Sequence, residues 1–114
     1  MVPGEPVVPG EAVVIIKNKP TFLTGQKTIP VAGTAVQLTT TNLQVPDNLP
    51  VIVIAKPDNT GYLSVASSKG DAEGGNAFYG LSAGLAVALW VTNVNIIWVT
   101  SSVAGDGVSW KLEV

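Results

Sequence analysis

Short apolar stretches separated by turn residues run along most of the chain, and this pattern predicts strands. Residues 12–17 (AVVIIK), 51–56 (VIVIAK) and 85–91 (LAVALWV) are continuous apolar runs, too short for helices and rich in side chains that favour strands. We expect 51–56 to be buried on both faces, because its apolar residues do not alternate with polar ones. Residues 108–114 alternate strictly, which predicts one buried and one wet face and fixes the register of that strand.

Turn signals separate these strands. Ala32-Gly33 predicts the two-residue connection of a hairpin between 26–31 and 34–40. Residues 57–61 (PDNTG) form the clearest turn, because Pro sets the first corner, Asp and Asn bond to nearby backbone and Gly accepts positive φ. Residues 67–76 (SSKGDAEGGN) are polar and Gly-rich, which indicates a surface loop. No segment has the periodicity of a helix.

The fold class follows from the number and spacing of the strands. The set comprises residues 12–17, 26–31, 34–40, 51–56, 62–66, 85–91, 96–100 and 108–114. About eight short strands at this spacing predict an all-β, antiparallel β-sandwich of jelly-roll-like type, with a small barrel as the alternative. Trp110 falls on the apolar stripe of the last strand and is expected in the core.

The start of the chain differs from the rest. Residues 2–13 (VPGEPVVPGEAV) repeat a Pro-containing unit, and Pro favours extended or turn conformations. The chain therefore divides into an extended Pro-rich N-terminal arm, residues 1–13, and a single sandwich domain, residues 14–114. The arm is either a disordered tail or a segment that orders on a neighbouring subunit. In the second case the partner-binding residues are Val2, Pro3, Pro6, Val7, Val8 and Pro9.

The residue types that are missing exclude several functions. The chain has no His and no Cys, which excludes zinc fingers, disulfides and His- or Cys-dependent catalysis. Its basic residues are six scattered Lys against eight acids, a net charge of −2, which gives no footprint for nucleic acid. No secretory signal is visible, and the longest apolar stretch is far shorter than the roughly 20 residues of a membrane span. We expect a soluble, non-enzymatic protein without cofactor or metal.

The remaining chemical candidates are few. Asp71 and Glu73 could bind a hard cation or act as acid and base, but carboxylates in a loop are usually solvated. Asp106, between two glycines, is interpreted as a turn residue that tolerates an unusual backbone angle. A Ser–Lys dyad would require Lys56 or Lys69 to be buried beside a Ser, for which the sequence gives no reason.

Aromatic residues offer a binding alternative. Several aromatic side chains could stack on sugar rings or cover a subunit boundary: Trp90, Trp98 and Tyr79, together with Tyr62 and Phe78. Charged residues make up only 12% of the chain and apolar residues 46%. Such a composition favours an obligate oligomer, because apolar surface then lies against other subunits.

Several segments carry a family resemblance: residues 25–28 (GQKT) leading to 32–38 (AGTAVQL), 51–61 (VIVIAKPDNTG), 80–84 (GLSAG) and 105–110 (GDGVSW). Their order resembles a group of small virion structural proteins of tailed bacteriophages. The resemblance covers most of the chain and excludes the arm.

The resemblance implies a viral protein on the capsid surface, made in the host cytoplasm. Such proteins are commonly trimeric capsid decoration, or cement, subunits, so the implied partners are the major capsid protein and copies of the chain in a homotrimer. The arm would lie across neighbouring capsid proteins. The alternative is a receptor- or glycan-binding module of a tail fibre or surface adhesin, with exposed aromatics beside polar loops.

Overall fold

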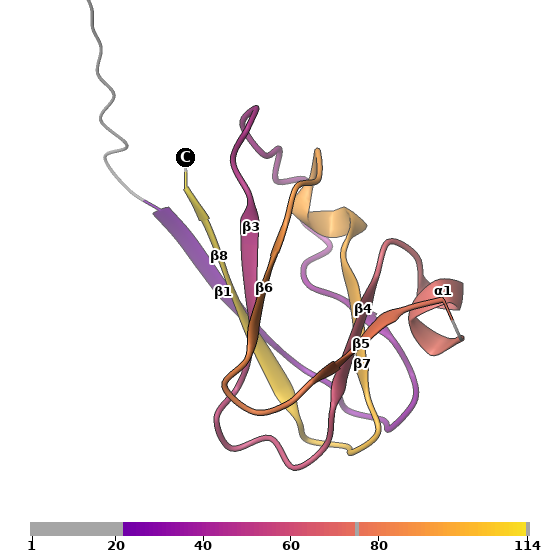
Figure 1. Cartoon of the computed structure of the whole chain (residues 1–114). Coiled ribbons are helices and arrows are strands. Elements are labelled where there is room, and N and C mark those ends of the chain that lie inside the picture. Colours follow the sequence, from indigo (N-terminus) through magenta and orange to yellow (C-terminus); the bar gives the residue numbers. More distant parts are fainter. Residues whose placement is uncertain (1–21, 75, 114) are drawn as a thin grey trace, which may run out of the picture.

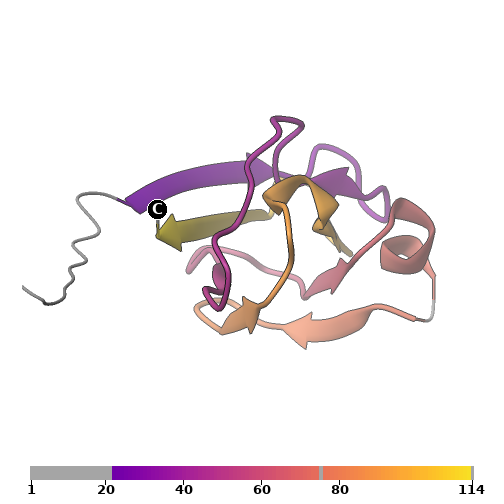
Figure 2. The same cartoon turned by 90° about the horizontal axis from the view of Figure 1, so that it is seen from above.

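Two four-stranded antiparallel sheets pack face to face in the computed structural model, which describes residues 22–74 and 76–113 (Figures 1 and 2). Sheet A has the order β1-β8-β3-β6, with β1 (Phe22–Thr28), β8 (Gly107–Glu113), β3 (Val51–Ala55) and β6 (Ala86–Leu89). Sheet B has the order β2-β7-β4-β5, with β2 (Val36–Gln37), β7 (Trp98–Ser101), β4 (Leu63–Ala66) and β5 (Phe78–Leu81).

This strand order is the jelly-roll arrangement of two Greek keys. The chain crosses repeatedly between the sheets, and only β4 and β5 are consecutive strands within one sheet. The prediction of a jelly-roll-like antiparallel sandwich is confirmed, and the barrel alternative is wrong because the strands form two separate sheets. The arm, residues 1–13, and the predicted strand 12–17 lie outside the described residues.

The core lies between the two sheets, where alternating side chains of each strand meet. In β8, Val108, Trp110 and Leu112 are buried, whereas Lys111 and Glu113 are exposed. The predicted register of this strand is therefore confirmed over its described length. The other buried apolar side chains of the core cluster are Ile29, Leu38, Val51, Val53, Ala55, Leu63, Val65, Leu81, Val94, Ile97 and Val99.

The prediction that 51–56 is buried on both faces is wrong. Val51, Val53 and Ala55 are fully buried, but Ile52 is half-buried and Ile54 is 37% exposed. The reason is that sheet B covers only one face of β3, and no described element covers the other. The apolar pattern correctly identified a strand in the interior of a sheet, but an uncovered apolar face has the same sequence pattern as a covered one.

The predicted hairpin around Ala32-Gly33 is also wrong. The backbone of β1 pairs with β8, and Ile29 N–H extends this pairing to Asp106 O at 2.9 Å. Gly33, with φ of 78°, then donates its N–H to Ser101 O of β7 at 2.8 Å, which is on the other sheet. The turn therefore connects sheet A to sheet B. Strand β1 pairs with β8 over its whole length, whereas β2 has only two residues and pairs with β7.

A short helix, α1 (Lys69–Glu73), lies within residues 67–76, which were predicted to be a surface loop. The prediction that the chain contains no helix is therefore wrong. The Ser68 side chain caps the helix by accepting the Asp71 N–H, and Ala72 is the buried residue of the helix. A 3₁₀ turn, η1 (Val94–Ile96), precedes β7, with the Asn93 side chain as its N-cap. Strand β5 was not among the predicted strands.

Candidate functional site

The predicted arm residues Val2, Pro3, Pro6, Val7, Val8 and Pro9 lie outside the described residues, so their role stays a prediction. The described chain begins in β1, where Phe22 pairs with Glu113 of β8.

The outer face of sheet A, the side turned away from sheet B, has no covering element among the described residues. Strand register places two rows of side chains across it: Thr24, Lys111, Ile52 and Ala88 in one row, and Gln26, Ser109, Ile54 and Ala86 in the next. Ile54 and Ala86 are exposed, and Ile52 and Ala88 are half-buried. The half of this face formed by β3 and β6 is thus apolar, and the half formed by β1 and β8 is polar.

A shallow hollow of about 380 Å³ crosses the outer face of sheet A between Ile54 and Gln26. The few charges at this face are already engaged. Lys56 Nζ donates to Gln26 Oε1 at 2.7 Å, and Lys111 Nζ lies 3.8 Å from Glu113 and 5.7 Å from the ring centre of Phe22. Lys56 thus has a hydrogen-bond acceptor but no acidic partner among the described residues, so a partner that covers this face must leave its ammonium group in solvent or supply an acceptor for it.

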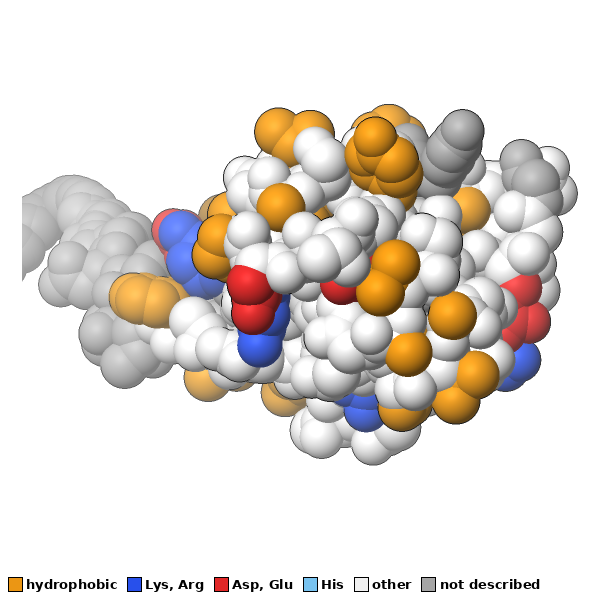
Figure 3. All heavy atoms as spheres, turned by 90° about the horizontal axis from the view of Figure 1, so that it is seen from below, with side chains coloured by type: hydrophobic (Ala, Val, Ile, Leu, Met, Phe, Trp, Pro, Cys, Tyr) orange, Lys and Arg blue, Asp and Glu red, His pale blue; other side chains and the backbone are white. Residues whose placement is uncertain are grey.

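The opposite end of the sandwich from the C-terminus also exposes apolar side chains. Val31, Tyr62 and Leu85 are between 50% and 60% exposed in the loops that gather there. Figure 3 views the molecule from this end and shows hydrophobic side chains scattered over the face, with few acidic and basic groups. This end of the sandwich therefore carries few charges.

The predicted aromatic residues are divided between the two sheets. Trp90 follows β6 of sheet A and is 66% exposed, beside a hollow of about 300 Å³ that residues 45–49 also line. Trp98 lies in β7 and is half-buried, and Tyr79 lies in β5 opposite Ser64. Trp90 does not share a sheet with the other two, and their role in an interface or a glycan site stays a prediction.

The two loop carboxylates of the sequence lie on α1. Glu73 Oε2 accepts the Ala35 N–H at 2.8 Å and Lys69 Nζ at 2.7 Å. The hydrogen bond from Lys69 and that from Ala35 together lower the pKa of Glu73. Glu73 thus fastens the helix to the start of β2. Within the described ranges, no three acidic side chains come close enough to hold a metal ion.

Asp106 is an anchor between loops, and its interpretation as a residue with an unusual turn angle is wrong. The positive φ of this turn, 91°, belongs to Gly105. The Asp106 carboxylate is 4% exposed and accepts the N–H groups of Thr60 at 3.0 Å and Gly61 at 2.9 Å, and the Ser101 hydroxyl at 2.8 Å. Burial raises the pKa of Asp106, but these hydrogen bonds outweigh burial and lower it.

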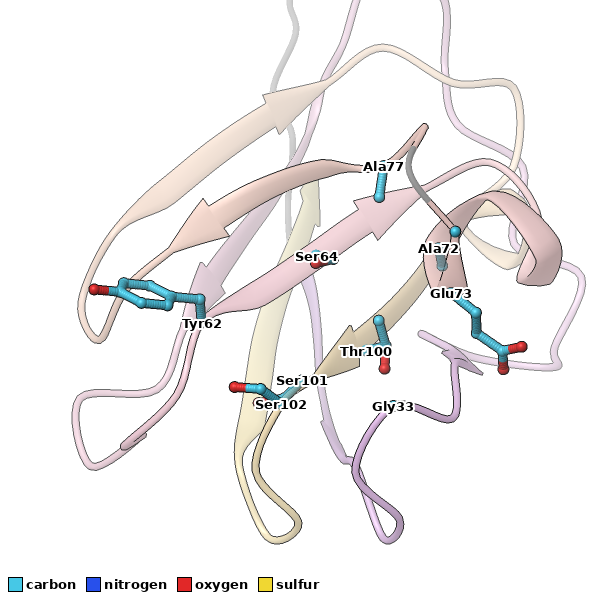
Figure 4. Close-up of a pocket in the computed structure, with 10 residues that line it drawn as sticks. Gly33, Tyr62, Ser64, Ala72, Glu73, Ala77, Thr100, Ser101 and Ser102 are labelled. Carbon is cyan, nitrogen blue, oxygen red and sulfur yellow. The ribbon is translucent and has the colours of Figure 1, made fainter.

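A third hollow, of about 430 Å³, lies between α1 and the outer face of sheet B. We call it the sheet-B hollow; its lining residues are Gly33, Tyr62, Ser64, Ala72, Glu73, Gly74, Ala77, Thr100, Ser101 and Ser102 (Figure 4). Sequence reasoning missed it, because the lining comes from segments far apart in the chain. The one local signal is the run of hydroxyl residues at positions 100–102.

The described helices are all too short to cross a membrane. Comparison of the chain with protein-family models, with curated proteins and with solved structures found no match. The resemblance to tailed-phage virion proteins therefore stays a prediction.

Proposed function

We propose that this chain is a non-enzymatic structural protein of a virus particle, a capsid decoration protein that stabilises a phage head by binding the major capsid subunits. In this proposal it acts as a homotrimer on the capsid surface. The observation that carries the proposal is the outer face of sheet A, where Ile52, Ile54, Ala86 and Ala88 form an apolar surface without a described covering element. An apolar strand surface of this kind is typical of a protein that assembles.

The distribution of large apolar side chains supports the proposal. The described residues that expose more than a third of such a side chain are Phe22, Leu23, Val31, Ile54, Tyr62, Phe78, Leu85 and Trp90. Aromatic side chains are enriched in protein interfaces and charged ones are depleted at their centres. A chain with only 12% charged residues matches this composition better than that of a free monomer.

The fold is compatible with the proposal. The jelly roll occurs in viral capsid proteins and in lectins. A fold by itself hosts many functions, so the strand order alone does not distinguish a decoration protein from a lectin, whereas an exposed apolar sheet face favours assembly.

Mass measurement tests the assembly. Light scattering of the purified chain should give three times the chain mass of 11.7 kDa, and mixing with empty capsids that lack this protein should move it quantitatively into the capsid fraction. A monomer would contradict the trimer, and a full-length chain that stays unbound would contradict the capsid role.

Deletion of residues 2–11 tests the arm. The shortened chain should remain a folded oligomer and lose capsid binding, because an extended arm contributes its contacts by wrapping over a neighbour. Unchanged capsid occupancy after the deletion would overturn the arm's role and leave the domain surface as the binding element.

The second candidate function is a receptor- or glycan-binding module of a tail fibre or adhesin. The observation that favours it is Trp90, 66% exposed beside a hollow that Asp47 and Asn48 also line. A glycan array tests it: binding should be strong for the intact chain and absent for Trp90→Ala, with Trp98→Ala as the comparison on the other sheet.

A further inference from the structure

Strand β1 is an edge strand of sheet A, and its outer side has no partner among the described residues. It has seven residues, whereas the other edge strands β6, β2 and β5 have four, two and four. The pairing of β5 also shifts register between Leu63 and Ser64 of β4. Open edges pair readily with other strands, so most are short, bulged or interrupted by proline. Since β1 is long, regular and without proline, we expect a partner strand along it.

The backbone groups of β1 alternate in direction between β8 and the open edge. Ile29, directly after β1, points both of its groups toward the start of β8: its N–H donates to Asp106 O at 2.9 Å, and its C=O accepts the Gly105 N–H at 2.8 Å. In an antiparallel ladder, the residues that bond to one neighbour alternate with residues whose groups point away from it. The described residues of β1 whose N–H and C=O groups point out from the open edge are therefore Phe22, Thr24, Gln26 and Thr28. All four are exposed.

Residues 12–17 (AVVIIK), which lie outside the described residues, have the composition of a strand and precede β1 closely in sequence. Residues 18–21 separate them from Phe22, and four residues is within the usual length of a hairpin loop. Further toward the N-terminus, Pro3, Pro6 and Pro9 recur, and proline has no N–H to donate to a ladder. The segment that could pair with β1 is therefore limited to residues 12–17.

A four-residue connection also determines the register of such a pairing. Ile15 then lies opposite Thr24, and Val13 lies opposite Gln26. Thr24 and Gln26 are positions at which the backbone groups of β1 point out from the open edge, so the pairing supplies partners for both.

The same register would cover apolar surface on the core side of β1. Ile16 lies opposite Leu23, and Val14 lies opposite Gly25. Leu23 is 37% exposed although it pairs with a fully buried residue of β8, and Gly25 presents only its backbone above the Trp110 indole. Two β-branched side chains beside these residues would remove apolar area from water, which stabilises the pairing.

We propose that residues 12–17 bind antiparallel along the open edge of β1 in the same chain, as a fifth strand of sheet A. The short connection favours the same chain over a second copy, because four residues hold the segment close to its partner. This binding covers an edge that could otherwise pair with strands of other chains. The inference does not depend on the proposed capsid role, since it concerns the folded domain alone.

Amide hydrogen exchange of the unmodified full chain, followed by NMR, tests the proposal. After correction for intrinsic rates, the amides of Thr24 and Gln26 should exchange at least about tenfold more slowly than that of Thr28. Thr28 is an internal control, because its counterpart in this register is Glu11, which lies outside the segment. Equal exchange at all three amides would overturn the proposal.

Ile15→Pro and Ile16→Pro are a matched pair of variants, because each removes one isoleucine and one N–H group. In the proposed register the N–H of Ile15 donates to Thr24 O, whereas that of Ile16 points away from β1. Ile15→Pro should speed exchange at the Thr24 and Gln26 amides at least about tenfold, and Ile16→Pro should keep more of their protection, because an edge strand tolerates proline on its solvent side. Equal exchange rates at these amides in the two variants would contradict the proposal.

An engineered disulfide distinguishes the same chain from a second copy, and the natural sequence has no Cys to interfere. Ile16→Cys with Leu23→Cys places two thiols directly opposite each other, with Cα atoms about 4.5 Å apart, which a disulfide can bridge. On oxidation this pair should form a link within a chain of 11.7 kDa, and in higher yield than Ile15→Cys with Leu23→Cys, whose side chains point to opposite faces. Links between chains would assign the segment to a second copy, and equal yields for the two pairs would show that it does not bind β1; either result overturns the proposal.

Discussion

Gly25 of β1 lies directly opposite Trp110 of β8, and a Cβ atom at position 25 would lie 2.4 Å from the indole ring. The indole, 6% exposed, thus packs against the bare backbone of the neighbouring strand. Glycine within a strand often marks such a close approach. Here it allows the largest side chain of the core to fit beneath the edge of sheet A.

Gly25→Ala should therefore destabilise the domain by about 1–3 kcal/mol, because the indole or the β1 backbone must move. Urea unfolding measures this loss. The control is Gly70→Ala in α1, where the added Cβ has no neighbour within 4 Å, and its stability should equal or slightly exceed that of the wild type. Equal stability of Gly25→Ala and the wild type would contradict the packing.

Asp106→Asn should lower the stability of the domain by about 1–3 kcal/mol at neutral pH. Each carboxylate oxygen of Asp106 accepts one backbone N–H group, from Thr60 or Gly61. In the amide an NH₂ group replaces one of these oxygens and cannot accept, so at least one of the two N–H groups loses its partner. Urea unfolding at pH 7 provides the measurement. Asp58→Asn, an exposed residue of the neighbouring turn, is the control and should have little effect.

Acid should weaken the contribution of Asp106 to the stability of the domain. The folded state lowers the pKa of Asp106, so its carboxylate stabilises the fold fully above the ordinary Asp value of about 4. That contribution is lost as the pH falls through the lower, folded-state pKa. As the pH is lowered below about 4, the free energy of unfolding should fall more for the wild type than for Asp106→Asn. If the free energy of unfolding of the two proteins falls in parallel, this role of Asp106 is ruled out.

Glu73→Gln should loosen the contact between α1 and the start of β2. The carboxylate accepts the Ala35 N–H and the Lys69 ammonium group, and the amide is a weaker acceptor for both. Amide hydrogen exchange at Ala35 should become faster, whereas Asp71→Asn, on the same helix, should leave it unchanged. Equal exchange rates in the wild type and Glu73→Gln would argue against the contact.

Trp90→Phe should remove most of the fluorescence that a soluble quencher can reach. Trp90 is 66% exposed, whereas Trp110 is 6% exposed in the core and Trp98 is half-buried. Acrylamide titration of the free protein measures the accessible fraction. A quenching curve that this variant does not change would be incompatible with the described exposure of Trp90.

Strand pattern predicted the two-layer fold because burial on one face leaves a local trace in the sequence. The alternation over β8 directs Val108, Trp110 and Leu112 inward, so its register could be read directly. The hairpin prediction failed because Ala32-Gly33 is a local signal, whereas the partner of β1 is the C-terminal strand, at the other end of the chain. Long-range pairing leaves no comparable local trace.

The candidate sites could be predicted only in part. The aromatic and apolar residues of the sequence indicated an interaction surface, and Trp90 is exposed. Ile54 is also exposed, although the sequence pattern predicted that it is buried. The helix had a usable signal, Ser68 three residues before Asp71, but the surrounding glycines favoured a loop. The sheet-B hollow had none beyond its hydroxyl residues, because the space between α1 and Thr100 exists only once the sheet has formed.

The central claim is that the outer face of sheet A is an assembly surface, and a charge placed on it provides the most direct test. Ile54→Lys introduces an ammonium group on that face, and Val31→Lys introduces the same group at a more exposed apolar site in the β1–β2 connection. Cosedimentation with empty capsids compares the two. We predict that Val31→Lys binds like the wild type and that Ile54→Lys, folded by circular dichroism, binds at least about thirtyfold more weakly. Wild-type binding by Ile54→Lys would contradict the account.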